Sequence, residues 1–363
     1  MIAKNNCQNK TLTILCQTQF GSHVATYFYC KYLRFSYNIT QICWDYSQPK
    51  QILNNVNCIY VSRNGNIITR NYRYLSAAHT WLKNNDCQIC FIKYFRGCSL
   101  LRLLHPEITF VFDIRTGSIS HNNLLRKLYD SLMMLESRAF KHVTVISQSL
   151  ALKLKITRKA YVLPLGSEAI SRKKRTFDSL HLLYVGTLSG RDIHKTLIAF
   201  ADFYHEHKNI NMSYTIIGDG PGGEVEHLKA IAKERAISNI VDITGRIPFT
   251  QLKPYFDAHN LGISFVPITD YFDSQPVTKT FDYLLSGMPV IATATAENKQ
   301  VINDKNGLLI DDSILGFYNG LRYMLNNKHN YNSENIIRTS SHYNWENIVN
   351  NLGTYFESLP SAH

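Results

Sequence analysis

The chain has 363 residues, of which 45% are hydrophobic and 18% are charged, and its formal net charge at pH 7 is +12. This composition excludes a largely disordered chain, and the length suffices for two domains that each have a core. No run approaches the 18 apolar residues that a membrane-spanning helix needs, and the first twenty residues contain only a four- or five-residue apolar run. We therefore expect neither a signal peptide nor a transmembrane helix, and a cytoplasmic location.

The first half of the chain alternates between strand-like and helical patterns. The strand-like runs are TLTILCQ (11–17), CQICFIKYF (87–95), ITFVFDI (108–114), VTVIS (143–147) and AYVLPL (160–165), and the clearest helical run is LLRKLYDSLMMLESRAF (124–140). All eight cysteines lie within the first 98 residues, mostly in apolar runs, which is typical of reduced, buried thiols. Cys87 and Cys90 have C-x-x-C spacing, but no second pair completes a metal site, so we favour buried thiols over a metal or redox centre.

Residues 165–179, LGSEAISRKKRTFDS, are polar, charged and aperiodic, which predicts a linker. Beyond them, strand-like runs again alternate with amphipathic helical patterns: HLLYVG, MSYTIIG, IVDITG, LGISFV, VIAT and GLLI are the strand-like ones. This order predicts a parallel, doubly wound sheet, so we expect an α/β protein with two Rossmann-like units. The expected division is 1–170, 171–334 and a terminal segment, 335–363, whose helix around Trp345 could pack back on the first unit.

The charge is unevenly divided along the chain. Residues 1–175 hold 25 Lys and Arg against 7 Asp and Glu, whereas the remainder holds 14 against 20. Nucleic acid, an anionic membrane surface and a phosphate-bearing substrate are the usual partners of such a basic half. The run RNYRY (70–74) interleaves basic and aromatic side chains, which suits a bilayer interface and a stacked base equally well. Solubility alone is a further explanation.

Three successive strands of the second half end in glycine, at Gly186, Gly218 and Gly245. Ligands of open parallel sheets bind beyond the carboxyl ends of the strands, and glycine lets a ligand approach the backbone closely. The helices that follow direct N–H groups at a bound anion, and Arg191 and Lys279 would add cationic donors for a diphosphate. Glycine after a strand is also common as simple turn geometry.

The stretch PVTKTFDYLLSGMPVIAT (276–293) predicts a helix that starts near Pro276, ends before Gly287 and leads into a buried strand. Lys279 and Asp282 share its polar face, opposite an apolar stripe. Taken alone, this face predicts a solvated i,i+3 ion pair that contributes about 0.2–0.5 kcal/mol. The alternative is that both residues bind a ligand.

The order YVGTL, IIGDGP, ITGRI, PVTKTFDYLLSGMPVIAT and NGLLI closely resembles the donor-binding half of retaining GT-B glycosyltransferases, specifically glycosyltransferase family 4, the glycosyl transferases group 1. The resemblance covers about 180–350, including Trp345, with weaker echoes upstream at Gly21, in FVFDIR (110–115), at Glu136 and in YVLPLG. It implies a GT-B fold, in which two Rossmann-like domains face each other across a cleft. It also implies a metal-independent hexosyltransferase that uses a nucleotide-diphosphate sugar as donor and no further cofactor.

The resemblance also implies roles for particular residues. The family carries two acidic residues eight positions apart on the helix before the G-x-P-V-I-A strand, and the second binds ribose. Asp282 matches the second, while Ser274 occupies the place of the first. Some members that resemble this chain have a lysine at the position of Lys279, which implies a diphosphate ligand. Thr187 stands where the family has an arginine, so Arg191 or Lys195 is the expected substitute.

The resemblance also implies which residues lie near the base and near the transferred sugar. Ile247 matches the position whose backbone contacts the base, and Gly186, Gly218 and Gly21 lie in the loops that approach the ligands. In the first domain Arg115 stands where a histidine commonly lies near the transferred sugar, and Asp113 precedes it by two residues. We therefore expect Lys279, Arg191, Asp113 and Arg115 to act in catalysis, and Gly21, Gly186, Lys195, Gly218, Ile247 and Asp282 to bind the donor.

The expected acceptor is a glycan or a polyprenyl-diphosphate-linked sugar at the inner face of the cell membrane, in capsule, exopolysaccharide or lipopolysaccharide assembly. The basic half would hold this acceptor and the anionic lipid surface, so we expect no nucleic-acid partner. Two alternatives remain: a nucleotide-sugar epimerase of the same fold, and a basic protein that binds nucleic acid. The second leaves the glycine-ended strands and residues 276–293 without a role.

Overall fold

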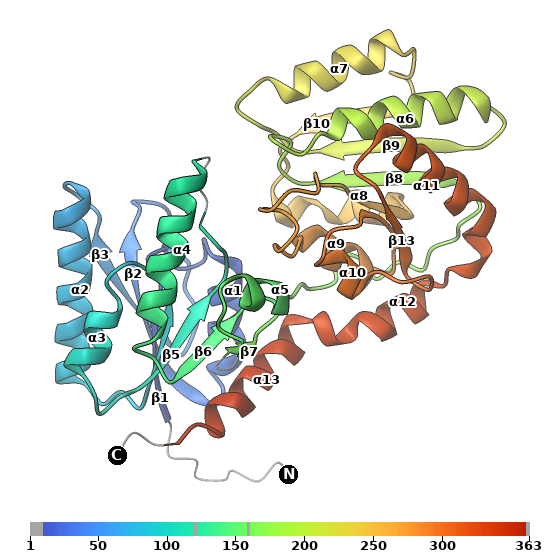
Figure 1. Cartoon of the computed structure of the whole chain (residues 1–363). Coiled ribbons are helices and arrows are strands. Elements are labelled where there is room, and N and C mark those ends of the chain that lie inside the picture. Colours follow the sequence, from blue (N-terminus) through green and yellow to red (C-terminus); the bar gives the residue numbers. More distant parts are fainter. Residues whose placement is uncertain (1–9, 119–121, 158–159, 361–363) are drawn as a thin grey trace, which may run out of the picture. The chain divides into compact units, whose positions relative to one another are not determined.

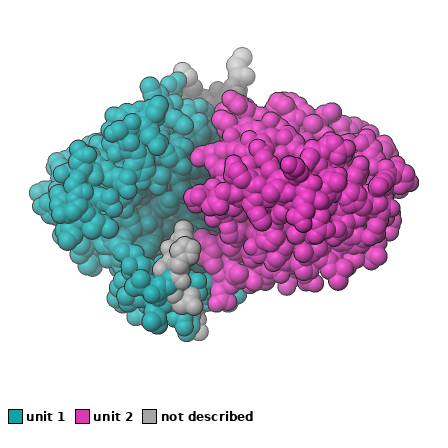
Figure 2. Space-filling view, turned by 90° about the horizontal axis from the view of Figure 1, so that it is seen from above, with its two compact units in different colours: residues 1–165, 345–363 teal, residues 166–344 magenta. Residues whose placement is uncertain are grey.

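The structure, a computed structural model, describes residues 10–118, 122–157 and 160–360, and the chain forms two compact units (Figures 1 and 2). Unit 1 contains residues 1–165 and 345–363, and unit 2 contains residues 166–344. The chain therefore crosses between the units twice, at 165–166 and at 344–345. These crossings lie five residues before the expected boundary at 170 and ten residues after the expected one at 334.

Unit 1 is built on a seven-stranded parallel sheet in the order β3-β2-β1-β4-β5-β6-β7. Its strands are β1 (Lys10–Leu15), β2 (Tyr37–Asp45), β3 (Val56–Ser62), β4 (Ile89–Lys93), β5 (Thr109–Ile114), β6 (His142–Val145) and β7 (Ala160–Val162). Strands β2 and β3 were not predicted from the sequence, although the alternating residues at the start of β2 and the short apolar run at 58–61 in β3 are both compatible with a strand.

Helices cover both faces of this sheet (Figure 1). They are α1 (Val24–Leu33), α2 (Ile67–Asn84), α3 (Ser99–Leu104), α4 (Asn123–Ser137), α5 (Gln148–Lys153) and α13 (Trp345–Glu357). One core cluster joins the sheet to α1 and α13, and a second joins it to α2, α3, α4 and α5. Trp345 belongs to the first cluster, where its ring stacks on Phe28 with 5.3 Å between the centroids.

Unit 2 has a six-stranded parallel sheet in the order β10-β9-β8-β11-β12-β13. Its strands are β8 (Leu180–Val185), β9 (Met212–Ile217), β10 (Val241–Gly245), β11 (Leu261–Ser264), β12 (Val290–Thr293) and β13 (Gly307–Ile310). Its helices are α6 (Ile193–Glu206), α7 (Glu224–Glu234), α8 (Lys253–Ala258), α9 (Thr278–Leu285), α10 (Asn298–Val301), α11 (Ile314–Asn327) and α12 (Ser333–Ser340). Two parallel, helix-covered sheets confirm the predicted α/β fold with two Rossmann-like units.

The predicted linker, 165–179, is not a free linker, because residues 166–176 are bound to unit 2. Arg175 is buried, and its guanidinium donates hydrogen bonds to the carbonyls of Phe256 (2.8 Å), His259 (3.0 Å) and Ser286. The carbonyls at the ends of α8 and α9 have no partner within their own helices, so this side chain satisfies acceptors that a helix end leaves open. Burial lowers the pKa of Arg175 to about 10. The polar composition of the segment suggested a solvent-exposed linker. Its polar groups instead form hydrogen bonds with the ends of α8 and α9.

Each sheet has one position at which the strand order reverses, between β1 and β4 in unit 1 and between β8 and β11 in unit 2. The helices that follow the two neighbouring strands there cover opposite faces of the sheet. The loops beyond their carboxyl ends therefore separate and leave a crevice, which is where open α/β sheets bind ligands. The loop with Gly21 follows β1, and the loop with Gly186 follows β8.

Candidate functional site

The glycine-ended strands of unit 2 bring three loops into direct backbone contact. The N–H of Gly186 donates to the carbonyl of Ile217 (2.9 Å), and the N–H of Gly218 donates to that of Gly245 (2.9 Å). A Cβ atom on Gly218 would lie 1.9 Å from the carbonyl oxygen of Gly186, so only glycine fits there. Gly186 itself has φ +151°, in the region that favours glycine. The space at Gly218 is thus filled by the neighbouring loop, and the predicted approach of a ligand to these glycines stays a prediction.

Lys279 lies directly against this loop. Its side chain is 8% exposed, and its Nζ is 3.6 Å from the ring centroid of Tyr184 and 3.0 Å from the place where a Cβ of Gly186 would be. Within the part of the chain that the structure describes, Nζ has no hydrogen-bond acceptor. Burial, and after it the charge of Arg191, lowers the pKa of Lys279 well below its ordinary value, while Asp282 opposes the shift. A buried amine without an acceptor is energetically costly unless a ligand supplies one.

Arg191 and Lys195, the two expected substitutes for the family's cation, differ in their surroundings. The ammonium of Lys195 forms an ion pair with Asp192 (3.0 Å) and donates to the carbonyl of Asp312 (3.2 Å). The guanidinium of Arg191 lies over the ring of Phe272, 4.1 Å from its centroid, and its charge acts on Lys279. Arg191 is therefore the better placed of the two to join Lys279 in holding an anion.

Asp282 lies one turn beyond Lys279 on α9. The hydroxyl of Ser167 donates a hydrogen bond to its Oδ1. Burial raises the pKa of Asp282 to about 7, and both the Ser167 hydrogen bond and the nearby charge of Lys279 oppose that rise. The solvated face predicted for α9 is therefore wrong. Lys279 is buried against Tyr184 and Gly186, the half-buried Asp282 is bonded to Ser167, and Ser286 on the same face accepts hydrogen bonds from the backbone N–H groups of Ile170 (3.1 Å) and Ser171 (3.3 Å).

Thr280, which the sequence analysis did not identify, fixes the register of α9 against the sheet. Its hydroxyl is buried 2.7 Å from that of Ser264 at the end of β11, and 3.2 Å from Oδ1 of Asn298. The Asn298 amide in turn donates to the carbonyl of Thr293 at the end of β12 (2.9 Å). A threonine beside Lys279 is the only sequence signal for this network, because its partners are separated from it by 16 and 18 residues.

Ser274 and Ile247 occupy the two remaining predicted positions in unit 2. Ser274, at the place of the family's first acidic residue, is buried, and its hydroxyl has no hydrogen-bond partner among the described residues. Ile247 follows the left-handed turn at Gly245 (φ +74°) beyond β10 and packs partly on the core. Its backbone therefore lies at the carboxyl edge of the sheet, on the same edge as Gly186 and Gly218.

In unit 1 the predicted residues Asp113 and Arg115 form a buried brace. Arg115 donates to the carbonyls of Leu163 (2.6 Å) and Pro164 (3.4 Å), and its Nη1 lies 3.9 Å from Oδ1 of Asp113. Thr144 also donates to that Oδ1 (2.7 Å). Burial raises the pKa of Asp113, and the charge of Arg115 is the main opposing influence. Both side chains thus secure the end of β5 to neighbouring strands.

His23 and Lys93 lie near this brace, and neither was among the residues predicted from the sequence. Gly21, with φ +87°, makes the turn after β1, and His23 follows it as the N-cap of α1. The pKa of His23 is lowered to about 3, chiefly by burial and then by the charges of Lys93 and Arg115. Lys93 ends β4, the strand next to β1 at the reversal point. A charged residue at the last position of a buried strand was the signal that could have identified it.

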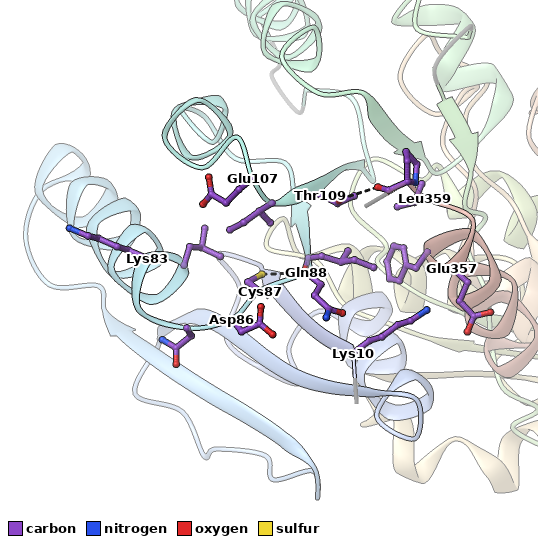
Figure 3. Close-up of a pocket in the computed structure, with 15 residues that line it drawn as sticks. Lys10, Lys83, Asp86, Cys87, Gln88, Glu107, Thr109, Glu357 and Leu359 are labelled. Atoms are coloured by element: carbon purple, nitrogen blue, oxygen red, sulfur yellow. Dashed lines mark hydrogen bonds between the residues drawn. The ribbon is translucent and has the colours of Figure 1, made fainter. Parts of the chain in front are cut away.

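A cavity of about 710 Å³ in unit 1 lies away from these residues (Figure 3). Lys10, Ile89 and Thr109, which begin β1, β4 and β5, line it together with Glu357 of α13. The strands are parallel, so the cavity lies at their amino ends, opposite the edge that carries Gly21, Asp113 and Arg115. No group of three or more His, Cys, Asp or Glu that could hold a metal ion occurs among the described residues.

A family of known proteins matches unit 2 of this chain. The model of the family described as "Glycosyl transferases group 1" matches residues 179–327, a stretch within unit 2 that is less than half of the chain. No curated protein sequence matches this chain. In residues 10–118, 122–157 and 160–360, no helix has the length and apolar character needed to cross a membrane.

Solved structures match over nearly the whole chain. A glycosyltransferase from Rickettsia africae has 14% identity and a TM-score of 0.74, covering 96% of this chain and 98% of its own. HepE of Anabaena, in complex with UDP and glucose, has 12% identity and a TM-score of 0.73, covering 97% and 100%. WaaG, a glycosyltransferase involved in lipopolysaccharide biosynthesis, has 14% identity and a TM-score of 0.67, covering 96% and 100%. These matches show that the fold is the GT-B fold.

The half-buried carboxyl of Asp282, whose pKa is raised, predicts a pH-dependent cost in stability. Between the pKa of an unfolded aspartate, about 3.9, and the folded value of about 7, folding must bind a proton. The cost therefore grows as the pH rises from about 4 to about 7 and then stays constant. Asp282→Asn should match the wild-type melting temperature near pH 4 and exceed it by several degrees at pH 8, at roughly 2–4 °C per kcal/mol.

Asp257 provides a control of opposite sign for these melting curves. Its pKa is lowered by Lys253 and by a hydrogen bond from Ser171 (2.5 Å), so its contribution is present above the unfolded pKa and is lost as the pH falls. Asp257→Asn should therefore melt below the wild type at pH 8. Parallel pH dependence of the two variants would contradict a raised pKa of Asp282.

The amine of Lys279 predicts that an anion binds together with a proton. A negative charge next to Nζ raises the lowered pKa of Lys279, so binding takes up protons. Calorimetric titration of inorganic pyrophosphate at pH 8, in buffers of different ionisation enthalpy, should give a positive slope equal to that uptake. The slope of Lys279→Met should be smaller, and its affinity roughly tenfold weaker. The difference between the two proteins removes the protons that pyrophosphate itself takes up.

Lys229, an exposed lysine on α7, provides the matched control for this titration. Lys229→Met also removes one positive charge from unit 2 and should leave both the slope and the affinity at wild-type values. Equal slopes for wild type and Lys279→Met would contradict an anion at Nζ.

Proposed function

We propose that the chain transfers a sugar from a nucleoside-diphosphate donor to an acceptor, with retention of the anomeric configuration. The observation that carries this proposal is Lys279, a buried amine without a hydrogen-bond acceptor among the described residues, beside the glycine loops at the reversal point of unit 2. The family match to unit 2 and the GT-B fold support it. HepE, one of the structures with this fold, holds UDP and glucose.

Unit 2 offers a complementary group for the diphosphate, the ribose and the base of such a donor. Lys279 and Arg191 would hold the diphosphate together with the N–H groups that follow Gly186. Asp282 is an acceptor that can bind both hydroxyls of a ribose, since a carboxylate offers about four lone-pair sites. The backbone at Ile247 would contact the base. The glycines at 186 and 218 let the two loops pack closely, and Gly186 also leaves space for the Lys279 amine.

The chemistry we propose needs positioning and charge stabilisation. Negative charge on the diphosphate grows as the bond to the sugar breaks, and the ammonium of Lys279 and the guanidinium of Arg191 stabilise that charge. The acceptor hydroxyl attacks the sugar from the face that the diphosphate leaves, which retains the configuration. Asp113 and Arg115 would act on the sugar side by holding the end of β5, next to His23 and Lys93.

We propose further that the acceptor is a glycan or a polyprenyl-diphosphate-linked sugar, and that unit 1 binds the inner face of an anionic membrane. Unit 1 contains 21 Lys and Arg against 8 Asp and Glu. WaaG, which shares the fold, acts in lipopolysaccharide biosynthesis, and this supports a similar setting in cell-surface polysaccharide assembly. An anionic surface attracts such a basic unit by about 1 kcal/mol per Lys or Arg near the lipid.

A row of exposed leucines on α4 supports the membrane proposal. Leu124, Leu125, Leu128, Leu132 and Leu135 are between 38% and 78% exposed, and their spacing places them within about 100° of the helix circumference. Met133, on the opposite side of α4, is buried in the core. Exposed Lys127 and Arg138 lie along one edge of the leucine row. An apolar stripe bordered by cations is the pattern of a helix that lies in a bilayer interface.

The neighbouring helix α3 extends this surface. The carboxylate of Glu136, near the end of α4, accepts hydrogen bonds from the N–H groups of Gly97 (3.0 Å) and Ser99 (3.2 Å), which join the two helices. Leu100, Leu103 and Leu104 of α3 are each more than half exposed. Both helices lie on the same side of the sheet of unit 1 (Figure 1). Two joined helices that each expose several leucines differ from ordinary surfaces, where apolar residues are scattered singly.

Two alternative functions, a nucleotide-sugar epimerase and a nucleic-acid-binding protein, can be distinguished from a glycosyltransferase by experiment. An epimerase of the same fold would convert a nucleotide sugar without any acceptor, so product formation from donor alone would favour it. A nucleic-acid-binding protein would bind generic DNA or RNA with a steep salt dependence and ignore nucleotide sugars. Screening nucleotide sugars by thermal shift separates the transferase from the second alternative, since a ligand that binds only the folded state raises the melting temperature.

Lys279 and Asp282 should affect catalysis in different ways. Asp282→Ala should raise KM more than it lowers kcat, because ribose is held alike in the ground and transition states. Lys279→Ala should mainly lower kcat, because charge on the diphosphate grows during the reaction. Losses of about 1–3 kcal/mol are expected for a charged hydrogen bond. Steady-state kinetics with the donor from the thermal-shift screen tests both, and wild-type turnover in both variants would rule out the site.

The leucine row predicts how vesicle binding should respond to mutation. Wild-type protein should co-sediment with vesicles that contain phosphatidylglycerol, less with phosphatidylcholine alone, and less as salt screens the charges. Replacing Leu124, Leu128 and Leu132 together by serine should weaken binding about tenfold or more, since each loses apolar burial in the bilayer.

Leu315→Ser is the control for the vesicle experiment, because Leu315 is also exposed, at 68%, but lies on α11 of unit 2. Equal vesicle binding by the triple variant and the wild type would count against α4 as the membrane surface. A leucine-dependent dimer in light scattering, without vesicle binding, would identify a second copy of the chain as the partner instead.

A further inference from the structure

Ser167 connects the candidate ribose-binding residue to both places where the chain crosses between the units. It is the second residue of unit 2 after the first crossing, and it is 3% exposed. Its N–H donates to the carbonyl of Tyr343 (3.0 Å), and it forms a parallel β-bridge with Asn344, the last residue before the second crossing. Its hydroxyl donates to Oδ1 of Asp282. One residue therefore contacts the site with its side chain and the second crossing with its backbone.

A second contact runs from the same crossing to α9. The ring of Tyr343 packs against that of Phe281, with 4.7 Å between the centroids. Phe281 immediately precedes Asp282, so Tyr343 supports the turn of α9 that carries the carboxylate. Ser167 and Tyr343 thus hold Asp282 from the two segments that enter and leave unit 2.

The Ser167 hydroxyl has a single proton and two acceptors within reach. It lies 3.0 Å from the carbonyl of Glu168 as well as beside Asp282. When Asp282 is ionised, the hydroxyl donates to the carboxylate. When Asp282 is protonated, the carboxyl O–H donates to Ser167 Oγ, and the serine proton turns to the Glu168 carbonyl. Either state keeps the link, and what changes is which of the two groups donates the hydrogen bond.

We propose that Ser167 is a positioning residue that holds the Asp282 carboxylate and couples its occupancy to the two crossing segments, 165–168 and 343–345. A ribose on Asp282, which rests on the proposed function, would share the carboxylate with Ser167 and change the strength of that hydrogen bond. The exchange of the Ser167 N–H, bonded to Tyr343, then reports on the site. The link itself exists without ligand, so it can be tested in the free protein.

Hydrogen exchange of the full chain, followed by mass spectrometry, tests the link. In Ser167→Ala and Asp282→Ala, peptides that cover the two crossing segments should exchange roughly three- to tenfold faster than in the wild type, the size expected when one hydrogen bond is lost. Ser167→Thr, which keeps the hydroxyl, should restore most of the protection. Asp202→Ala is the control, because it removes only the surface pair with Arg235 (2.9 Å).

Uridine diphosphate serves as the probe for the coupling between occupancy of Asp282 and the two crossing segments. It should change protection at both crossing segments in the wild type, whereas Ser167→Ala should still bind it but show a much smaller change there. Wild-type exchange at the crossings in both alanine variants would overturn the proposal, as would an unaltered response to uridine diphosphate in Ser167→Ala. If no nucleoside diphosphate binds the wild type, the proposed function fails, and exchange in the free variants still decides the role of Ser167.

Discussion

The buried amine of Lys279 is the constraint on which the arrangement of unit 2 depends. It lies against the ring of Tyr184 and the backbone of Gly186, and neither supplies a hydrogen-bond acceptor. The aromatic face offers a cation some compensation, but less than a carboxylate would. The hydroxyl of Tyr184 donates to the carbonyl of Thr187 (2.7 Å), so the same residue holds the loop in place. Unit 2 therefore keeps a costly group in a fixed position, as expected of a binding site and not of a core.

Burial shifts the pKa values of Lys279 and Asp282 in opposite directions. Burial disfavours the charged form of each, which lowers the pKa of the lysine and raises that of the aspartate. Their mutual attraction opposes both shifts without cancelling them. In a solvent-exposed ion pair both groups would be charged at neutral pH. A ligand would then gain little binding free energy by restoring their charged forms. A ligand that brought negative charge to Lys279 and hydroxyl donors to Asp282 would restore both charged forms. In the function proposed above, the two residues would bind different parts of one donor molecule.

The basic segment 166–176 shows how the scaffold around this pair is held. Arg175 satisfies open carbonyls at the ends of α8 and α9, and Ser286 receives two N–H groups of the same segment. Both ends of unit 2 therefore meet beside α9, through Ser167 and Asn344. In unit 1, Arg115 has a comparable structural role, since it bonds the carbonyls of Leu163 and Pro164 just before the first crossing. In each unit an arginine fixes the backbone near the crossing, while other groups remain available for chemistry.

The sequence by itself determined the class of fold, the glycine-ended strands, and Lys279 and Asp282 as neighbours on one helix face. These follow from local periodicity and from short motifs, which act over a few residues. It did not reveal β2 and β3, the anchored segment 166–176, or Lys195 as the partner of Asp192. Only the tertiary structure decided that Lys279 on this face of α9 is buried and that Ser167 reaches Asp282 across 115 residues of sequence. The physical reason is that a helix pattern separates polar from apolar faces, whereas the element packed on the polar face determines whether it meets water or protein.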